Sequence, residues 1–309
     1  MWEEKRLNQV QLLKRLERPQ GKVDVVLDTD TYNEIDDQFA LAYLIKSDEK
    51  LSLQAIYAAP FFNHHSESPK DGMEKSYQEI HKVLKLMGRE EFCKVTYRGS
   101  ERYLPDENTP VDSPAARNLV ERAMERKDDN PLYVVAIGAI TNVASAILME
   151  PEIIRKIVVV WLGGNALDWH DNKEFNAYQD VAADRVIFGC GVPLVQLPCM
   201  GVVSAFTTTG PELEYWLRGK NELCDYLIDN TAQEAVMFAK AKPWSRAIWD
   251  VTAVAWLLDG DFMLDRLEHS PIPEYDDKWG FDKTRHFIKY VYAIKRDNLF
   301  DDLFSKLSN

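Results

Sequence analysis

Cysteine is scarce in this sequence, and long apolar runs are missing from it. The four cysteines, Cys93, Cys190, Cys199 and Cys224, are far apart, so no close pair is present to build a thiolate metal site. We therefore expect reduced thiols among apolar residues and a cytoplasmic protein. No apolar stretch reaches the length of a membrane span. Residues 1–20 are charged and amphipathic and have no apolar signal-peptide core, so we expect no secretory leader.

Positive charge is also in the minority. The chain has 37 lysines and arginines against 50 aspartates and glutamates, which gives a net charge of −13. This balance disfavours non-specific binding to nucleic acid or to an anionic membrane, so we expect neither as a partner. It is compatible with a nucleoside, which carries no phosphate. Repeats, low-complexity tracts and long linkers are absent as well, which favours one domain over residues 1–309.

Strand-like and helix-like runs alternate along the chain. This alternation predicts an α/β fold with a mostly parallel central sheet flanked by helices. An N-terminal helix is expected within residues 1–20, the core over 21–260, and a helical C-terminal part over 261–309, where 286–307 reads as one amphipathic helix. That helix would pack on the core or on a second subunit. The expected strands are 23–27, 53–58, 94–97, 132–137, 157–162 and 194–197, and the other expected helices are 35–46, 72–87, 113–126, 141–149, 181–188, 211–218, 224–239 and 245–258.

The most informative stretch is residues 25–37, with the sequence VVLDTDTYNEIDD. Four aspartates, Asp28, Asp30, Asp36 and Asp37, fall within ten residues, where the first strand ends and a helix begins. Open α/β sheets bind their ligands at such strand ends. Clustered carboxylates repel one another unless a cation compensates them, and oxygen ligands suit Ca²⁺. The alternative is a solvated acidic loop, because acids are also favoured at a helix N-terminus.

This opening resembles the signature of the nucleoside hydrolases, the inosine- and uridine-preferring N-ribohydrolases. Four further segments follow in the family's order: 59–63 (APFFN), 135–142 (VAIGAITN), 162–180 with its Gly-Gly-Asn and Glu-Phe-Asn, and 249–255 (WDVTAVA). The resemblance implies a Rossmann-like fold and hydrolysis of the N-glycosidic bond of ribonucleosides, aided by Ca²⁺. It also implies a homodimer or homotetramer.

The resemblance further implies a role for each matching residue. Asp30 would bind the metal and act as general base, and Asp37, Asp250 and the backbone carbonyl of Ile137 would complete the protein ligands. Asp28 would support this cluster from behind. The ribose hydroxyls would be bound by Asp36, Asn63, Glu174 and Asn176.

Two departures from the family pattern bear on the substrate. The loop Thr31–Ile35 is two residues longer than usual, so Tyr32 or Asn33 could project into the site, or the loop could simply bulge on the surface. Trp249 stands where the pyrimidine-tolerant branch has histidine and the purine-preferring branch has tryptophan. It favours stacking on a purine, although a core tryptophan is the alternative.

Some positions keep more than one interpretation. His64, His65 and His170 could protonate a leaving base or be loop histidines without a chemical role. A second stacking aromatic could be any of Tyr32, Phe61, Phe62, Trp161 and Trp169.

Three other functions were weighed. A Mg²⁺-dependent phosphatase of the haloacid-dehalogenase type also opens with two aspartates after a strand, but it needs threonine where this chain has Tyr32. A hydrolase of another ribosyl compound and a non-catalytic nucleoside- or ribose-binding protein fit the same scaffold, because a fold does not fix a substrate.

Overall fold

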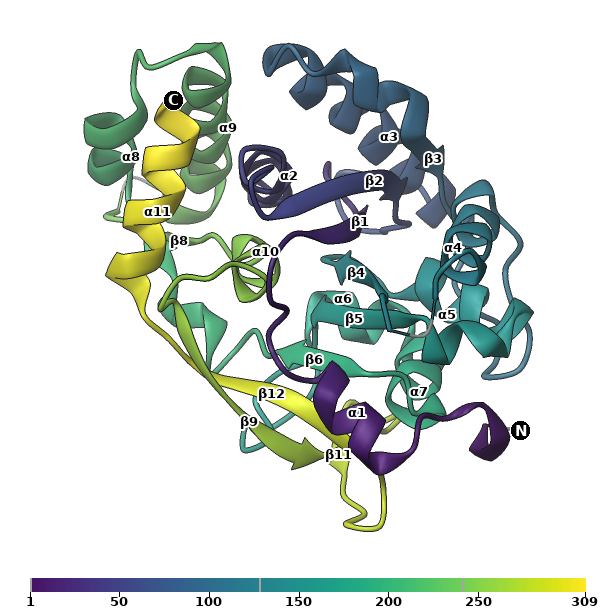
Figure 1. The fold of residues 1–309 in the computed structure, drawn as a ribbon. Coiled ribbons are helices and arrows are strands. Elements are labelled where there is room, and N and C mark those ends of the chain that lie inside the picture. Colours follow the sequence, from purple (N-terminus) through teal and green to yellow (C-terminus); the bar gives the residue numbers. More distant parts are fainter. Residues whose placement is uncertain (1, 128, 241) are drawn as a thin grey trace.

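The computed structural model describes residues 2–127, 129–240 and 242–309. Within this part of the chain, eight strands form one sheet in the order β3-β2-β1-β4-β5-β6-β12-β9, with helices on both of its faces (Figure 1). Only β9 runs antiparallel to its neighbour, and the other pairs are parallel. The strands are β1 (Val23–Thr29), β2 (Leu51–Ala58), β3 (Thr96–Arg98), β4 (Leu132–Ala136), β5 (Ile157–Leu162), β6 (Leu194–Leu197), β9 (Met263–His269) and β12 (Phe287–Ile294). The expected α/β fold with a mostly parallel sheet is confirmed.

The helices alternate with the strands as far as β6, and then follow one another. They are α1 (Gln9–Arg15), α2 (Asp37–Ile45), α3 (Pro69–Leu86), α4 (Pro114–Met124), α5 (Thr141–Met149), α6 (Phe175–Gln179), α7 (Val181–Cys190), α8 (Gly210–Leu217), α9 (Glu222–Ala239), α10 (Val251–Trp256) and α11 (Arg296–Ser308). Two short ladders pair β7 (Thr207–Thr208) with β8 (Arg246–Ala247) and β10 (Ile272–Pro273) with β11 (Trp279–Gly280).

The sheet has a hydrophobic core on each face. Alternate residues of β1 go to opposite sides, so that Val25 and Leu27 join one core while Val26 joins the other. Helices α2, α3, α10 and α11 cover the first face, and α4, α5 and α7 cover the second. Because both faces are covered, the central strands read as nearly continuous apolar runs rather than alternating ones.

Helix starts in this chain follow recognisable local chemistry. The hydroxyls of Ser68 and Ser113 accept the backbone N–H groups of the first turns of α3 and α4, and a proline follows each serine. Proline suits this position because its missing N–H would have no partner inside the helix. The expected N-terminal helix is shorter than predicted: α1 begins after its cap at Asn8 and ends well before Gln20.

The helix expected over residues 286–307 is wrong in its first half. Residues 287–294 form β12, which pairs with β6 on one side and β9 on the other, and only residues 296–308 form α11. The segment FIKYVYAI is rich in aromatic and β-branched residues, whose apolar positions fit both a strand and a helix. Pairing with two strands decided between them. The helical character predicted for residues 261–309 therefore holds for α11 but not for residues 263–294.

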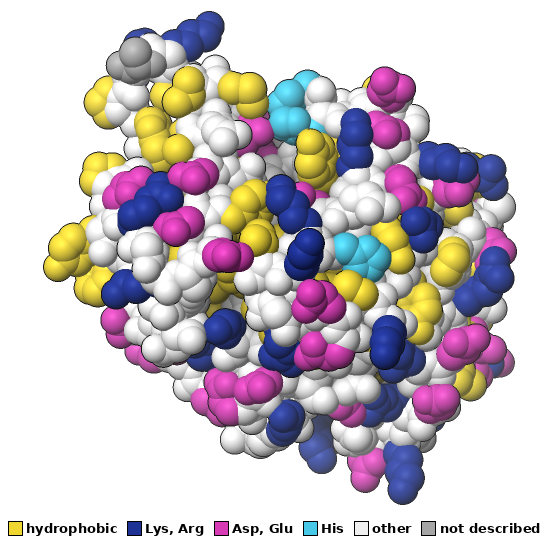
Figure 2. All heavy atoms as spheres, turned by 90° about the horizontal axis from the view of Figure 1, so that it is seen from above, with side chains coloured by type: hydrophobic (Ala, Val, Ile, Leu, Met, Phe, Trp, Pro, Cys, Tyr) yellow, Lys and Arg dark blue, Asp and Glu magenta, His cyan; other side chains and the backbone are white. Residues whose placement is uncertain are grey.

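The surface carries charge of both signs. Figure 2 shows acidic and basic side chains interspersed over one face of the molecule. Several form ion pairs, such as Arg98 with Glu74 and Arg117 with Asp112. All four cysteines are free thiols, and Cys190, Cys199 and Cys224 are buried, as expected. Among the residues that the structure describes, no helix combines the length and apolar character that crossing a membrane requires.

The packing of α11 against the core leads to a testable prediction about the stability of the protein. Leu303 is fully buried in the same core as α2, so Leu303→Ala should lower the free energy of unfolding by about 2–5 kcal/mol. Val10→Ala, at a position that is 78% exposed, should change it by about 0.5 kcal/mol or less. Urea unfolding at several protein concentrations measures both. A cost for Leu303→Ala that vanished on dilution would show that α11 packs on a partner instead.

Candidate active site

The site lies where β1 and β4 end side by side. The chain leaves β1 toward β2 on one side, whereas β4 and β5 follow on the other, so the strand order reverses here. The backbone N–H of Ile137, just past β4, donates to the carbonyl oxygen of Asp28 at 2.9 Å. Asp30 follows β1 directly and is completely buried. A Cβ atom added at Gly138 would lie 3.0 Å from the Asp30 carboxyl carbon, so this glycine lets the β4 loop approach the carboxylate closely.

Two further carboxylates come from the start of α2. Asp36 caps the helix and Asp37 is its first residue, and both are buried. The hydroxyl of Thr29 donates a hydrogen bond to Asp37. Gln38 donates to the carbonyl of Thr31 at 2.8 Å, which fixes the longer loop against the helix.

Asp250 brings a carboxylate from far along the chain. It stands at the start of α10, and its backbone N–H donates to Asp36 at 3.3 Å. One carboxylate oxygen from each of Asp36, Asp37 and Asp250 lies within 4.8 Å of the others. Asp36 belongs to this trio, although the family resemblance predicts that it binds the sugar. Asp30, which the resemblance predicts as a metal ligand, is not one of the three but lies beside them. The roles of Asp30 and Asp36 stay predictions.

The carboxylates make one another harder to ionise, because their negative charges repel. Burial raises the pKa of Asp30 well above its usual range, and the charges of Asp37 and Asp36 raise it further. Burial also raises the pKa of Asp250 well above its usual range, and the charge of Asp36 is the second largest cause of this shift. Burial also raises the pKa of Asp37 to about 7, although the hydroxyl of Thr29 works against this shift. Several buried acids this close together are costly to ionise, and the charge of Arg246 offsets only part of this cost at Asp36.

This environment fits a bound cation. Both oxygens of the Asp30 carboxylate are buried and have no hydrogen-bond partner among the described residues. A buried carboxylate ordinarily finds partners, so two such atoms beside three other carboxylates are what a hard, oxygen-binding metal ion would satisfy. The residues present therefore suit Ca²⁺ or a similar divalent ion.

Asp28 lies behind the cluster. Its carboxylate accepts a hydrogen bond of 2.7 Å from the amide of Asn142, a residue in the first turn of α5. Asn142 in turn accepts hydrogen bonds from the backbone and the hydroxyl of Ser100. Burial raises the pKa of Asp28 to about 7, which the bond from Asn142 partly offsets. The geometry is compatible with the supporting role that was predicted for Asp28.

A cavity of about 230 Å³ opens above the carboxylates. Its size lies near the low end of small-molecule sites, which span roughly 300–1,000 Å³. Six of the predicted residues line it: Asp36, Ile137, Glu174, Asn176, Trp249 and Asp250. The structure thus gathers these six residues from four separate segments of the chain around one small space.

Glu174 and Asn176 are held by the backbone around them. Glu174 caps α6, and its carboxylate accepts the backbone N–H groups of Gly164, Asn176 and Ala177 at 2.9–3.1 Å. Burial raises the pKa of Glu174, whereas these hydrogen bonds lower it. The amide of Asn176 donates to the carbonyl of Leu162 at 3.1 Å. Both side chains are therefore fixed before any ligand arrives.

Asn63 does not line the cavity in this structure. Its amide donates to the side-chain oxygen of Asn33 at 2.7 Å, and its own oxygen accepts the backbone N–H of His65 at 2.8 Å. Asn33 lines the cavity instead, so one of the two candidates in the longer loop does reach the site. Tyr32, the other one, is 42% exposed and meets the ring of His65 edge-on.

Sequence reasoning missed several residues of the cavity wall. These are Glu34, Leu162, Asn165, Lys173, Phe175, Cys199 and Met200. Lys173 and Phe175 flank Glu174 in the sequence. Cys199 and Met200 follow the end of β6, so the rule that ligands bind at strand ends could have identified them. Phe175 is an aromatic of this wall, whereas none of the five aromatics considered as a second stacking partner lines it. Trp161, one of those five, is fully buried and donates to the carbonyl of Gly138.

The chain is similar in sequence to known proteins. The family described as inosine-uridine preferring nucleoside hydrolase matches residues 25–295. Among curated proteins, a pyrimidine-specific ribonucleoside hydrolase of Enterobacter sp. (strain 638) is 27% identical over 164 residues, which cover 48% of this chain and 50% of that protein. The chain thus spans about half the length of the curated relatives it matches.

Solved structures share the fold over nearly the whole chain. A purine-preferring ribonucleoside hydrolase from Gardnerella vaginalis superposes with a TM-score of 0.76 at 20% identity, covering 92% of this chain and 98% of that one. A plant nucleoside hydrolase gives a TM-score of 0.75 at 18% identity, covering 94% and 99%. At such identities these structures establish the Rossmann-like nucleoside hydrolase fold and no more. Since the family match extends over most of the sequence, the chain belongs to the inosine-uridine preferring nucleoside hydrolase family.

Proposed function

We propose that this protein hydrolyses the N-glycosidic bond of ribonucleosides, giving ribose and a free base, and that it depends on Ca²⁺. The observation that carries the proposal is the buried Asp30 carboxylate, whose two oxygens have no hydrogen-bond partner among the described residues, beside the trio Asp36, Asp37 and Asp250. Of this trio, Asp36 and Asp250 line a small cavity. Family membership supports the reaction class. The alternative that the paired aspartates belong to a phosphatase is not supported, because the matched family is one of nucleoside hydrolases.

The ion would be held by Asp30, Asp37, Asp250 and the carbonyl of Ile137. When bound, Ca²⁺ would acidify a water molecule and orient it together with the sugar hydroxyls. Asp30 would accept the proton of this water as the water oxygen attacks C1′ of the ribose. The bond between C1′ and the base nitrogen breaks, its electron pair leaves with the base, and a proton from solvent neutralises the base. Attack from the face opposite the base would invert the configuration at C1′.

Side chains around the cavity would stabilise the sugar as positive charge develops on it. Glycosidic cleavage passes through an oxocarbenium-like transition state, so carboxylates and amide oxygens near the ring favour it. Asp36 and Glu174 provide the carboxylates, and Asn176 provides an amide. Asn33 lines the wall and accepts a hydrogen bond from the amide of Asn63, so we propose that Asn33 binds a ribose hydroxyl beside Asp36 and that Asn63 orients Asn33.

Base preference is a finer proposal. Trp249 lines the cavity directly before Asp250, so an Asp250 that binds the metal beside the ribose would place the indole next to the base. We propose a preference for purines by stacking on this indole. The relatives include both base preferences, since one is described as pyrimidine-specific and another as purine-preferring. A cytoplasmic location and a homo-oligomeric state also stay predictions.

A second candidate is a non-catalytic nucleoside- or ribose-binding protein on the same scaffold. The complete set of buried carboxylates favours the enzyme, because a binding protein has no need of a general base. Hydrolysis of another ribosyl compound differs only in the leaving group. Measuring free ribose from a panel of ribosyl compounds, with and without chelator, separates these functions.

Asp30→Asn should reduce turnover by about 10²- to 10⁴-fold or more, because it removes the general base and weakens the metal site together. Ribose release from inosine in excess Ca²⁺ measures this. Asp276→Asn makes the same chemical change at an exposed position and should leave the rate unaltered. Treatment with EDTA should abolish wild-type activity, and added Ca²⁺ should restore it. Full activity in Asp30→Asn would disprove the assignment.

2′-Deoxynucleosides should be poor substrates, because the buried polar groups that would bind the missing hydroxyl are left unpaired. Sites built to bond a hydroxyl reject analogues lacking it by about 10⁴- to 10⁵-fold. The measurement is kcat/KM for inosine against 2′-deoxyinosine. Equal values for the two substrates would contradict the sugar contacts proposed for Asp36, Asn33, Glu174 and Asn176.

Trp249→Ala should lower kcat on inosine by about 10- to 100-fold if stacking is felt mainly in the transition state, since stacking on one aromatic contributes about 1–3 kcal/mol. Trp216→Ala, on α8 and outside this cavity, is the matched control and should keep wild-type kcat. The wild-type protein should also favour inosine over uridine in kcat/KM. A clear preference for uridine would show that the branch assignment is wrong.

A further inference from the structure

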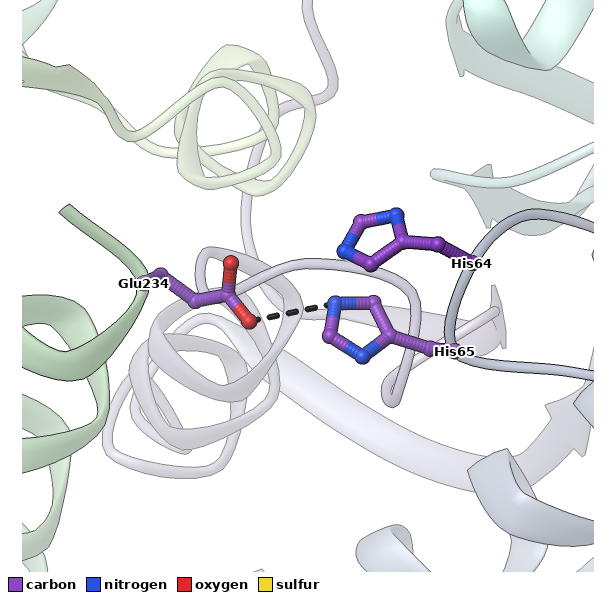
Figure 3. A group of neighbouring side chains, drawn as sticks. All are labelled: His64, His65 and Glu234. Carbon is purple, nitrogen blue, oxygen red and sulfur yellow. Dashed lines mark ion pairs between the residues drawn. The ribbon is translucent and has the colours of Figure 1, made fainter. Parts of the chain in front are cut away.

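A second group of metal-binding side chains lies outside the carboxylate site. His64 and His65 stand in the loop between β2 and α3, and Glu234 lies on α9. One ligand atom from each of the three lies within 4.8 Å of the others. Figure 3 shows the two imidazoles and the carboxylate pointing toward one another across the gap between the loop and the helix.

The loop holds this arrangement in place. The backbone N–H of His65 donates to Asn63 at 2.8 Å, and its carbonyl accepts from the ammonium group of Lys75 at 2.8 Å. The two histidine rings lie 3.9 Å apart between centroids, and the edge-on ring of Tyr32 flanks His65. His65 Nε2 is 3.1 Å from a carboxylate oxygen of Glu234. The imidazole is therefore directed at α9 by contacts on several sides.

The donor set has a definite chemical preference. Two imidazole nitrogens and one carboxylate oxygen are a ligand set of Zn²⁺ sites that keep a position open for water. Imidazole favours Zn²⁺ and related transition ions, whereas Ca²⁺ and Mg²⁺ prefer oxygen alone. A ligand imidazole must be neutral. Burial lowers the pKa of His65, which favours its neutral form. Among the described residues, His64 makes no hydrogen bond that would compete for its ring nitrogens.

We propose that His64, His65 and Glu234 form a second metal site, which takes Zn²⁺ or a similar transition ion and not Ca²⁺. An ion bound there would tie the loop after β2 to α9. Asn63 belongs to the same loop and is hydrogen-bonded to Asn33 in the cavity wall, so the ion would also restrain this part of the wall. The proposal does not rest on the reaction proposed above, because it concerns binding alone.

The test is a calorimetric titration of the untagged, full-length protein with Zn²⁺ in excess Ca²⁺, which occupies sites made only of oxygens. Wild type should bind one Zn²⁺ per chain. His65→Ala and Glu234→Ala should weaken this binding by about 100-fold or more, since even residues behind a metal ligand cost about 10- to 100-fold when removed. His170→Ala is the matched control, because His170 is an exposed histidine that also has an acidic neighbour, Asp171. It should bind Zn²⁺ as wild type does.

Two further measurements keep the outcome decisive. Co²⁺ bound in place of Zn²⁺ should give the strong visible absorption of a four-coordinate site with nitrogen ligands, and Zn²⁺ should slow amide hydrogen exchange in residues 62–68. Glu234→Gln, which keeps the shape of the side chain, serves if Glu234→Ala unfolds. Displacement of Zn²⁺ by Ca²⁺, or equal affinity in wild type and the His65 and Glu234 variants, would overturn the proposal. Loss of ribose release would leave these binding results unchanged, so the two proposals fail independently.

Discussion

Mutual repulsion among buried carboxylates is the constraint on which this structure depends. Asp30, Asp36, Asp37 and Asp250 lie together with little exposure to water, and the charges of Asp36 and Asp37 raise the pKa of both Asp30 and Asp250. Such an arrangement is costly in the charged form, and either protonation of the carboxyls or a cation that offsets their charge lowers the cost. The parallel strands supply a rigid support, because β1 and β4 end side by side with apolar layers on both faces. The starts of α2 and α10 add their backbone N–H groups, which favour negative charge.

The longer loop after β1 changes what surrounds this cluster. Asn33 enters the cavity wall, and Asn63 supports it from the next strand's loop rather than lining the cavity itself. The same two loops bring Tyr32 and His65 into contact. The insertion is therefore part of the site, and it links the cavity wall to the histidines that face α9. A substitution in either loop should change the conformation of the other, because the two loops share side-chain hydrogen bonds and an aromatic contact.

The cavity wall also carries the groups on which the proposed base selectivity would depend. Trp249 and Phe175 provide aromatic surface in this wall, and Lys173 and Glu34 provide charges. Asp250 and Trp249 are neighbours in sequence, so an Asp250 that binds the metal would also fix where the indole lies. Under the proposed function, one short segment would combine metal binding with recognition of the base.

The sequence by itself determined six of the eight strands of the sheet, most of the helices and the acidic cluster. Continuous apolar runs marked β1, β4 and β5 because both faces of the sheet are covered. Asp28, Asp30, Asp36 and Asp37 were recognisable because they follow a strand within ten residues. Asp250 and Glu174 came only from the family resemblance, since nothing local shows that they reach the same place.

Tertiary structure alone decided the rest. The segment 287–294 fits a helix or a strand equally well by its pattern, and pairing with β6 and β9 made it a strand. Asn33 rather than Asn63 lines the cavity because of how two loops pack, which no spacing reveals. Glu234 meets His64 and His65 across about 170 residues of chain because α9 lies beside the loop after β2. Contacts of this kind depend on where separate elements meet, and local patterns carry no information about that.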